Sequence, residues 1–234
     1  MKSLRVQQLN EQFEMNYNNW LDKQWDIFPV LFRLKDNKWN IMISAPHSVN
    51  HLREWEILKA DMLTWWLALY LAEKYNLPCI YSTSYLVWDP NYDEYENSKY
   101  KQELKKYITD NDIKFLVDLH WCRSERDFAI ELWTWWDNHP NLLSNNKLLN
   151  IISDSLTNSL KSYLQHNKKD ISVNNIFPAS NKNTVSNFVA SNFNVPALQL
   201  EINYDLRDIS KTDNINKLIT ALENLISDLE NYYA

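Results

Sequence analysis

The sequence predicts a three-layer α/β/α fold around a mixed, mostly parallel sheet, and three observations lead to this prediction. Short apolar runs alternate with amphipathic stretches along the chain, which is the order typical of helices that cover a parallel sheet. Within the run over residues 113–120, the stretch 113–117 is apolar except for Lys114, as in a largely buried strand. No internal repeat and no linker interrupts the 234 residues, so we expect a single domain spanning residues 1–234.

The first half of the chain contains three short apolar runs of the kind expected for strands, and they span 26–34, 39–45 and 79–83. We expect the first two to form a hairpin through a polar turn at 35–38. The third begins just after Pro78, where a missing N–H does no harm. Apolar residues at helical spacing predict two helices, over 56–75 and 98–111. The polar stretch 88–98 between them is expected to be a loop.

The second half continues the alternation. Apolar runs predict three strands, over 113–120, 126–133 and 195–203. Amphipathic segments predict three helices, over 145–167, 183–193 and 212–233. The carboxyl ends of these strands are where an open α/β sheet gathers its functional groups.

Composition excludes several classes of protein. The net charge of −6 and the pI near 5.4 argue against nucleic acid as the main partner. No run of 18 apolar residues is present, so we expect no membrane span. The N-terminal segment lacks the apolar core of a signal peptide, which favours a cytoplasmic protein. Cys79 and Cys122 are expected to be free thiols.

The chain contains no glycine, although it contains 11 tryptophans. A chain of this length would ordinarily carry about 16 glycines, many of them where the backbone needs a positive φ. Asparagine is the next best residue for that conformation, and it is abundant here. We interpret the sequence as one from which glycine has been excluded, with other residues filling its sites.

Polar residues at the ends of three expected strands indicate a metal site. His47 follows the strand at 39–45, His120 closes the strand at 113–120, and Glu201 closes the apolar part of 195–203. A catalytic zinc ion needs about three nitrogen or oxygen ligands, so a third must lie nearby. Glu54 and Asp61 are the candidates from the residues alone.

Each of these residues also has a structural reading. His47 after a proline could cap a turn, His120 could be a hydrogen-bonded core histidine, and Glu201 could be a salt-bridged acid. His51 could pair with His47 as a second ligand on one helical turn. Cys122 is a softer ligand candidate, for which packing is the alternative.

Four blocks, SAPHS, LVDLH, ERDFAIEL and PALQLEIN, resemble in order and spacing the N-formylglutamate amidohydrolase-like family, relatives of the zinc carboxypeptidases and aspartoacylases. The resemblance runs from about residue 39 to about residue 207. It implies a sheet of the phosphorylase/hydrolase-like type found in zinc peptidases. Other residues stand at the family's glycine positions, and these are Ser48 or Val49, Trp121, Trp133 and Asn181.

The resemblance implies a role for several residues. His47, Asp61 and His120 would bind Zn²⁺, with Glu54 as the fallback for the third ligand. Glu201 matches the acid that acts as general base. Arg126 would stabilise the oxyanion, and Asp118 would orient a ligand histidine. The residues implied to hold a substrate carboxylate are Asn91 and one of Arg53, Arg126 and Arg207, because Tyr92 stands where the related enzymes have arginine.

The expected activity is therefore zinc-dependent hydrolysis of the amide bond of an N-acyl (N-formyl) amino acid, such as N-formylglutamate. A carboxypeptidase or another deacylase of the same clan is one alternative. The other is an inactive protein that binds zinc or ligand, because Trp121 beside His120 and Ser48 beside His47 replace residues that leave room for substrate.

Overall fold

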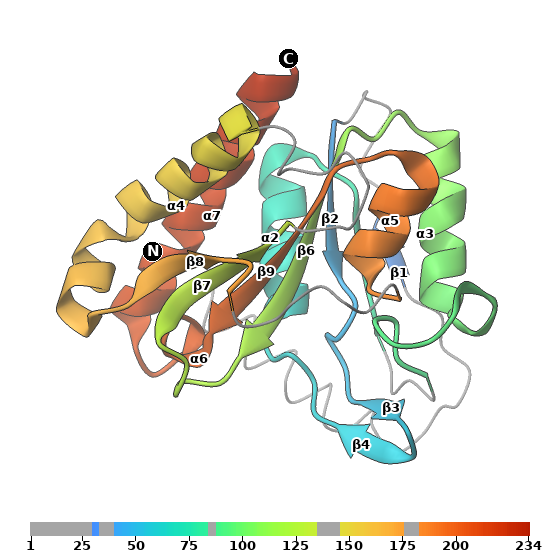
Figure 1. Cartoon of the computed structure of the whole chain (residues 1–234), viewed down its shortest axis with the longest axis horizontal. Helices are drawn as coiled ribbons and strands as arrows, with labels where there is room; N and C mark the ends of the chain where they lie inside the picture. Colours follow the sequence, from blue (N-terminus) through green and yellow to red (C-terminus); the bar gives the residue numbers. More distant parts are fainter. Residues whose placement is uncertain (1–29, 33–39, 84–87, 135–145, 176–182) are drawn as a thin grey trace.

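The computed structural model describes residues 30–32, 40–83, 88–134, 146–175 and 183–234, and within them the chain forms three α/β/α layers (Figure 1). The predicted fold class is confirmed. The turn expected at 35–38 and most of the strand expected at 26–34 lie outside the described residues. None of the helices in the described ranges is long and apolar enough to cross a membrane.

The middle layer is a seven-stranded sheet. Its strands, in order across the sheet, are β1 (Val30–Phe32), β5 (Cys79–Tyr81), β2 (Ile41–Ala45), β6 (Phe115–Cys122), β9 (Ala197–Asn203), β7 (Phe128–Trp133) and β8 (Asp170–Val173). The β5–β2, β2–β6, β6–β9 and β7–β8 pairs are parallel. The β1–β5 and β9–β7 pairs are antiparallel, so the sheet is mixed.

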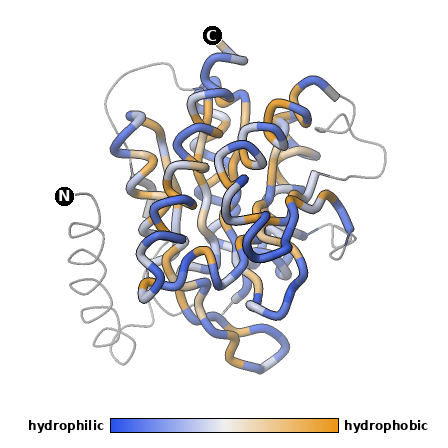
Figure 2. The backbone as a smooth tube through the Cα atoms, turned by 90° about the vertical axis from the view of Figure 1, so that its left-hand side faces the viewer, coloured by the Kyte–Doolittle hydropathy of each residue, from blue (hydrophilic) through white to orange (hydrophobic). Residues whose placement is uncertain are grey.

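Helices cover both faces of this sheet. One face is covered by α2 (Thr64–Tyr75), α4 (Asn146–Asn167) and α7 (Thr212–Tyr233), and the other by α3 (Lys99–Asp110) and α5 (Val185–Phe193). Hydrophilic and hydrophobic residues alternate along the helical parts of the chain (Figure 2), as expected of amphipathic helices that bury one stripe. Each face of the sheet therefore has its own apolar core.

The alternation of side chains along the central strands places the polar residues. On β6, Val117 and Leu119 point into the core beneath α2 and α7, whereas Leu116 points into the core beneath α5. Because successive side chains on a strand point to opposite faces, Asp118 and His120 follow Leu116 on the α5 face. They lie towards the carboxyl end of the strand, where the functional groups of an open sheet gather.

The segment between β2 and α2 differs from the prediction. The helix expected over 56–75 begins only at Thr64. The residues before it form a two-stranded hairpin, β3 (His51–Arg53) and β4 (Glu56–Leu58), which projects below the main sheet in Figure 1. Leu63 has a φ of 73° directly before the helix, and this left-handed residue breaks the helical path. The apolar pattern over 57–62 therefore belongs to the hairpin and its exit.

The strand pairing near the N-terminus also corrects the prediction. The expected hairpin between residues 26–34 and 39–45 does not form, because β5 lies between β1 and β2 in the sheet. Two short elements were not anticipated, the edge strand β8 and the one-turn helix α6 (Tyr204–Arg207). A 3₁₀ turn, η1 (Tyr95–Asn97), also falls inside the expected polar loop at 88–98.

Residues other than glycine occupy the left-handed backbone positions. In the described part of the chain, φ is positive at Glu54, Trp55, Leu63, Asn76, Lys168, Asn174 and Asn194. Asparagine fills three of these positions, and Asn76 and Asn194 end α2 and α5 in the place where helices usually carry glycine. The others carry a bulkier side chain in a conformation that costs about 1–2 kcal/mol per residue.

Candidate active site

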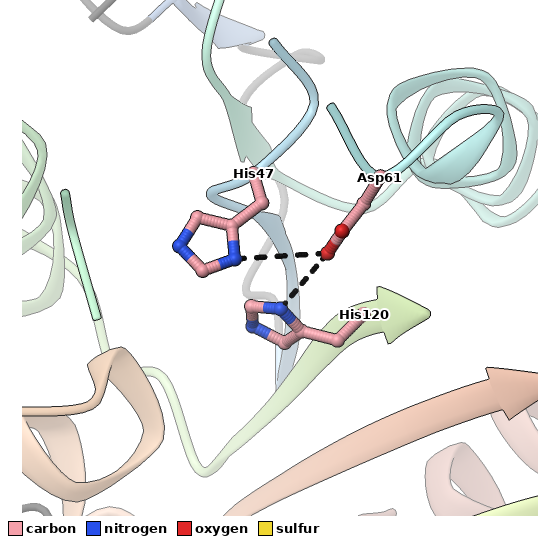
Figure 3. Close-up of side chains that lie close together, drawn as sticks. All are labelled: His47, Asp61 and His120. Atoms are coloured by element: carbon pink, nitrogen blue, oxygen red, sulfur yellow. Dashed lines mark hydrogen bonds and ion pairs between the residues drawn. The ribbon is translucent and has the colours of Figure 1, made fainter. Parts of the chain in front are cut away.

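Three buried side chains converge from three separate segments of the chain (Figure 3). His47 follows β2, His120 lies in β6, and Asp61 lies between the hairpin and α2. The Asp61 backbone N–H donates to the His47 carbonyl oxygen at 2.7 Å, which fixes the two segments together. The Asp61 Oδ2 atom lies 3.1 Å from Nδ1 of His120 and 3.7 Å from Nδ1 of His47. Both rings therefore turn the same nitrogen towards one carboxylate.

The other ring nitrogen of each histidine faces a second carboxylate. Nε2 of His47 lies 2.7 Å from Oδ1 of Asp89, and Nε2 of His120 lies 3.2 Å from Oδ2 of Asp118. A carboxylate on the far nitrogen is the usual support of a metal-ligating histidine, because it fixes the tautomer and the ring orientation. Asp118 thus stands where it was expected to orient His120.

The donor set fits a zinc ion. His47, Asp61 and His120 each offer one ligand atom, these atoms lie within 4.8 Å of one another, and all three residues are buried. Two imidazole nitrogens and one carboxylate oxygen are a ligand combination used by catalytic zinc. Burial alone would lower the pKa of His120, but Asp118 and Asp61 raise that pKa well above its usual value. Burial likewise opposes a charged Asp61, whose pKa is nevertheless lowered by both histidines.

His51 packs face to face on His47, with ring centroids 4.1 Å apart and an interplanar angle of 4°. It opens β3, so the two residues are not on one helical turn. His47, His51 and Asp89 form a second group with metal-ligand spacing. However, Nε of Arg53 lies 2.5 Å from Oδ2 of Asp89. The Asp89 carboxylate is thus already paired with a positive charge, so it suits an orienting role better than ligation.

Glu201 lies beside the three-residue cluster. The parallel pairing of β6 with β9 sets Glu201 directly opposite His120. The carboxyl group is buried and accepts a hydrogen bond from Nε2 of Gln199 at 3.0 Å. Burial raises the pKa of Glu201 to about 7, although His120 opposes this rise. A carboxyl group with such a pKa can both accept and release a proton near neutral pH.

These groups open into one cavity of about 840 Å³. It lies between the hairpin, the β6–β7 connection and the carboxyl ends of β6 and β9. Four cationic side chains line it, those of Arg53, Lys59, Arg123 and Arg126. Four large apolar side chains also line it, those of Ile57, Leu58, Trp121 and Trp133. The cavity therefore suits a ligand with both an anionic and an apolar part.

The structure brings most of the expected substrate-binding residues to this cavity. Arg53, Asn91 and Arg126 line it, but Arg207 does not. The Arg207 guanidinium lies 4.2 Å from the centre of the Trp121 ring and donates to the Met62 carbonyl oxygen. Asn91 is held within the protein: its Oδ1 accepts from the Val185 backbone N–H, and its Nδ2 lies 3.1 Å from Nε2 of His120.

Two other ligand candidates, Glu54 and Cys122, do not join the cluster of His47, Asp61 and His120. Glu54 lies in the exposed turn of the hairpin, where it accepts a hydrogen bond from the Tyr92 hydroxyl. Asp61, and not Glu54, therefore completes the cluster. Cys122 lines the cavity, but burial raises the pKa of its thiol to about 12. In the described part of the chain, its sulfur does not belong to either group of side chains whose ligand atoms lie together.

Asp89, Gln199 and Glu131 are polar residues of the site that sequence reasoning missed. Glu131 on β7 pairs with Glu201 in the antiparallel register and accepts from the Asn175 backbone N–H at 2.7 Å. Asp89 lies 42 positions from His47 in the chain, in a segment that was expected only to be a polar loop. The one signal for Asp89 was its place two residues before Asn91, but nothing local showed that this loop folds onto His47.

No protein-family model and no curated protein sequence matches the chain. Solved structures do resemble it. N-formylglutamate amidohydrolase from Ralstonia eutropha is similar with a TM-score of 0.58 at 10% identity, over 87% of this chain and 97% of that chain. A gene product from Agrobacterium tumefaciens is similar with a TM-score of 0.56 at 13% identity, over 89% of this chain and 97% of that chain.

A metallo-carboxypeptidase from Pseudomonas aeruginosa is similar with a TM-score of 0.52 at 11% identity, over 94% of this chain and 68% of that chain. These likenesses lie at low sequence identity, but each extends over most of the present chain. The chain therefore has the α/β/α fold that N-formylglutamate amidohydrolase and the metallo-carboxypeptidases share.

Proposed function

We propose that the protein is a zinc-dependent hydrolase that cleaves the amide bond of an N-acyl amino acid, such as N-formylglutamate. The observation that carries the proposal is the convergence of His47, Asp61 and His120 beside Glu201 at the edge of one cavity. The fold shared with an N-formylglutamate amidohydrolase and with metallo-carboxypeptidases supports it. The residues that matched the related enzymes in the sequence are the ones that meet here.

Nδ1 of His47, Nδ1 of His120 and the Asp61 carboxylate would hold the metal ion. When bound, zinc supplies a water of near-neutral pKa and polarises the substrate carbonyl. Asp89 and Asp118 keep the two rings turned towards the ion. Since His120 carries a raised pKa without metal, zinc binding would release protons, and zinc affinity would rise with pH.

Glu201 would move the protons of the reaction. Its carboxylate would take a proton from the attacking water and deliver it to the leaving amine nitrogen. A pKa near 7 suits both transfers, because the group is then a usable base and a usable acid at neutral pH. Gln199 donates to one carboxylate oxygen of Glu201, which lines the cavity.

The cationic residues of the cavity would bind the charged parts of the substrate. Arg126 lines the cavity and would stabilise the oxyanion, and Arg123 comes from the same β6–β7 connection. A guanidinium can hold a carboxylate through two parallel hydrogen bonds, which suits a substrate with a free carboxylate. Arg53 is engaged with Asp89, and Asn91 with His120, so both would act through the ligands.

Zinc stoichiometry tests the proposal first. Protein purified without chelator should contain about one zinc ion per chain. His120→Ala should lose it, whereas His166→Ala, which removes an exposed histidine at the end of α4, should keep it. Absence of zinc from the wild-type protein, even after soaking, would overturn the enzyme proposal.

Turnover of N-formylglutamate then separates a hydrolase from an inactive zinc-binding protein. Glu201→Gln should lower kcat by roughly 100-fold or more, since it removes the general base, while zinc content stays unchanged. The cavity of about 840 Å³ exists with Trp121 in place, which favours an active site over a blocked one.

Peptides with a free C-terminus test the carboxypeptidase alternative. Cleavage of those peptides in preference to N-acyl amino acids would replace the proposed substrate class.

A further inference from the structure

The cavity is larger than a formyl group requires. Its volume of about 840 Å³ lies in the upper part of the range, roughly 300–1,000 Å³, that holds drug-sized ligands. N-formylglutamate has a single carbon atom on the acyl side of its amide bond. The remaining space is large enough to hold a longer acyl group.

Three of the apolar side chains that line this space come from two elements that meet beside it. Ile57 and Leu58 come from β4, and Trp121 comes from the end of β6. The indole Nε1 of Trp121 donates to the Ala60 carbonyl oxygen at 3.2 Å, so the ring reaches the chain just beyond β4. We call Ile57, Leu58 and Trp121 the hairpin wall.

Trp121 is held as a fixed part of this wall. Its ring is fastened at one end by the hydrogen bond to Ala60. The Arg207 guanidinium packs against the ring at 4.2 Å, an arrangement that stabilises a cation over an aromatic face. Arg207 is itself buried and hydrogen-bonded to the Met62 carbonyl oxygen. A ring supported in this way offers a preorganised apolar surface beside His120.

The outer end of the wall is exposed. Ile57 lines the cavity, yet its relative exposure is 65%, and Trp55 at the hairpin turn is 92% exposed. Apolar side chains that remain exposed next to a site often mark a ligand surface. The hairpin wall thus leads from the candidate metal ligands to the mouth of the cavity. The cations Arg123 and Arg126 come from a different segment, the β6–β7 connection.

We propose that the site selects N-acyl amino acids whose acyl group is an extended apolar chain, with the chain lying along the hairpin wall and the amino acid carboxylate at Arg123 and Arg126. This inference rests on the proposed amide hydrolysis and narrows its substrate class. Water would add across the amide C–N bond. The carbonyl carbon would leave as a fatty acid, and the nitrogen would leave as the amine of the amino acid.

The test compares N-formyl-, N-acetyl- and N-hexanoyl-glutamate as substrates of the zinc-loaded protein. One fully buried methylene contributes roughly a fourfold factor. We therefore expect kcat/KM for the hexanoyl substrate to exceed that for the acetyl substrate by at least about tenfold, as burial of two methylenes would give. Ile57→Ser should lower this ratio several-fold. Met62→Ser should not, since Met62 is also an exposed apolar residue but lies outside the cavity lining.

Binding gives a second readout that does not depend on turnover. Calorimetry on zinc-loaded Glu201→Gln should show the same preference for the hexanoyl compound in Kd. Hydrolysis of all three compounds with equal kcat/KM would overturn the apolar subsite and leave the proposed function standing. No hydrolysis of any compound would overturn the proposed function, and the Kd ratio would then decide the subsite alone. Equal Kd values for the acetyl and hexanoyl compounds would overturn the apolar subsite.

Discussion

Asp89 is the residue that orients the candidate metal ligand His47. It is completely buried, and its Oδ1 faces both Nε2 of His47 and the backbone N–H of Asn91. Its Oδ2 faces Arg53 and His51. Burial opposes a charged Asp89, but the neighbouring His47 and His51 hold its pKa well below the usual range. A permanent negative charge at this position keeps Nδ1 of His47 directed at Asp61.

We expect Asp89→Asn to weaken zinc binding by about 10-fold to 100-fold, because loss of a carboxylate behind a ligand histidine typically has this effect. A chelator competition titration measures the change. Asp112→Asn is the matched control, since Asp112 is an exposed acid paired with Lys114. Equal zinc affinity in the wild-type and Asp89→Asn proteins would show that zinc binding does not depend on His47 being held by Asp89.

Glu201 makes the stability of the metal-free protein depend on pH. Its folded-state pKa of about 7 lies above the ordinary value of 4.5 for a glutamate side chain, so the folded state binds the proton more tightly than the unfolded state. The stability that this proton provides is fully present below pH 4.5 and is lost as the pH rises towards 7. The total is of order 3 kcal/mol, because one pKa unit corresponds to about 1.4 kcal/mol.

Glu201→Gln removes this titration. The free energy of unfolding of the metal-free variant, relative to the wild-type protein, should therefore grow between about pH 4.5 and pH 7 and stay level above that range. Denaturant titrations at several pH values measure the difference. A constant difference across this range would show that the carboxyl group does not have a raised pKa in the folded protein.

At the scale of elements, turns without glycine are the main source of backbone strain. Trp55 in the hairpin turn has a φ of 70°, and Lys168 after α4 has a φ of 52°. Both side chains are exposed, so their replacement removes little packing. Two-residue hairpin turns with positive φ values favour the pair Asn-Gly. In this chain, Glu54 and Trp55 occupy these two turn positions.

Trp55→Gly and Lys168→Gly should each raise the free energy of unfolding by about 1 kcal/mol, since glycine adopts the left-handed region without a clash at Cβ. Chemical denaturation gives the value. Trp55→Ala and Lys168→Ala are the controls, because they shorten the same side chains and keep Cβ. A gain of equal size in the alanine variants would assign the effect to the side chains and not to the backbone.

The same turns limited what the sequence could predict. The chain reverses at Glu54-Trp55 and breaks its helical path at Leu63, and none of these residues marks a turn locally. The helix over 56–75 was therefore predicted too long. The strands β6 and β9 were predicted well, because their apolar runs need no turn signal. Strand partners are set by contacts distant in sequence, which is why β5 between β1 and β2 was not foreseen.

At the scale of the whole molecule, the fold class could be predicted from the alternation of strands and helices. His47, His120 and Glu201 could be predicted as neighbours because they follow or close expected parallel strands. Asp61 lies at no strand end, and only the family resemblance favoured it over Glu54. His120 and Glu201 are brought together by the β6–β9 register alone. The packing around them could not be predicted. Asp89, the stacked ring of His51 and the Arg207–Trp121 contact all depend on how separate segments pack together, which no local pattern records.

Zinc should stabilise the whole fold, because its expected ligands lie far apart in the chain and on different elements. Asp61 lies 59 positions from His120, and the cluster joins β2, β6 and the segment before α2. A ligand that binds only the folded state adds about 2.7 kcal/mol at a free concentration of 100 times its Kd. The melting temperature of the protein should therefore rise with zinc and fall again with a chelator.

The variants show whether this stabilisation comes from the proposed site. His120→Ala should lose most of the zinc-dependent rise in Tm, whereas Glu201→Gln should retain it, because Glu201 is not one of the three expected ligands. Differential scanning calorimetry at several zinc concentrations provides the measurement. An equal rise in the wild-type protein and in His120→Ala would place the bound metal elsewhere. The shared fold would then persist in this chain without the metal centre proposed at its strand ends.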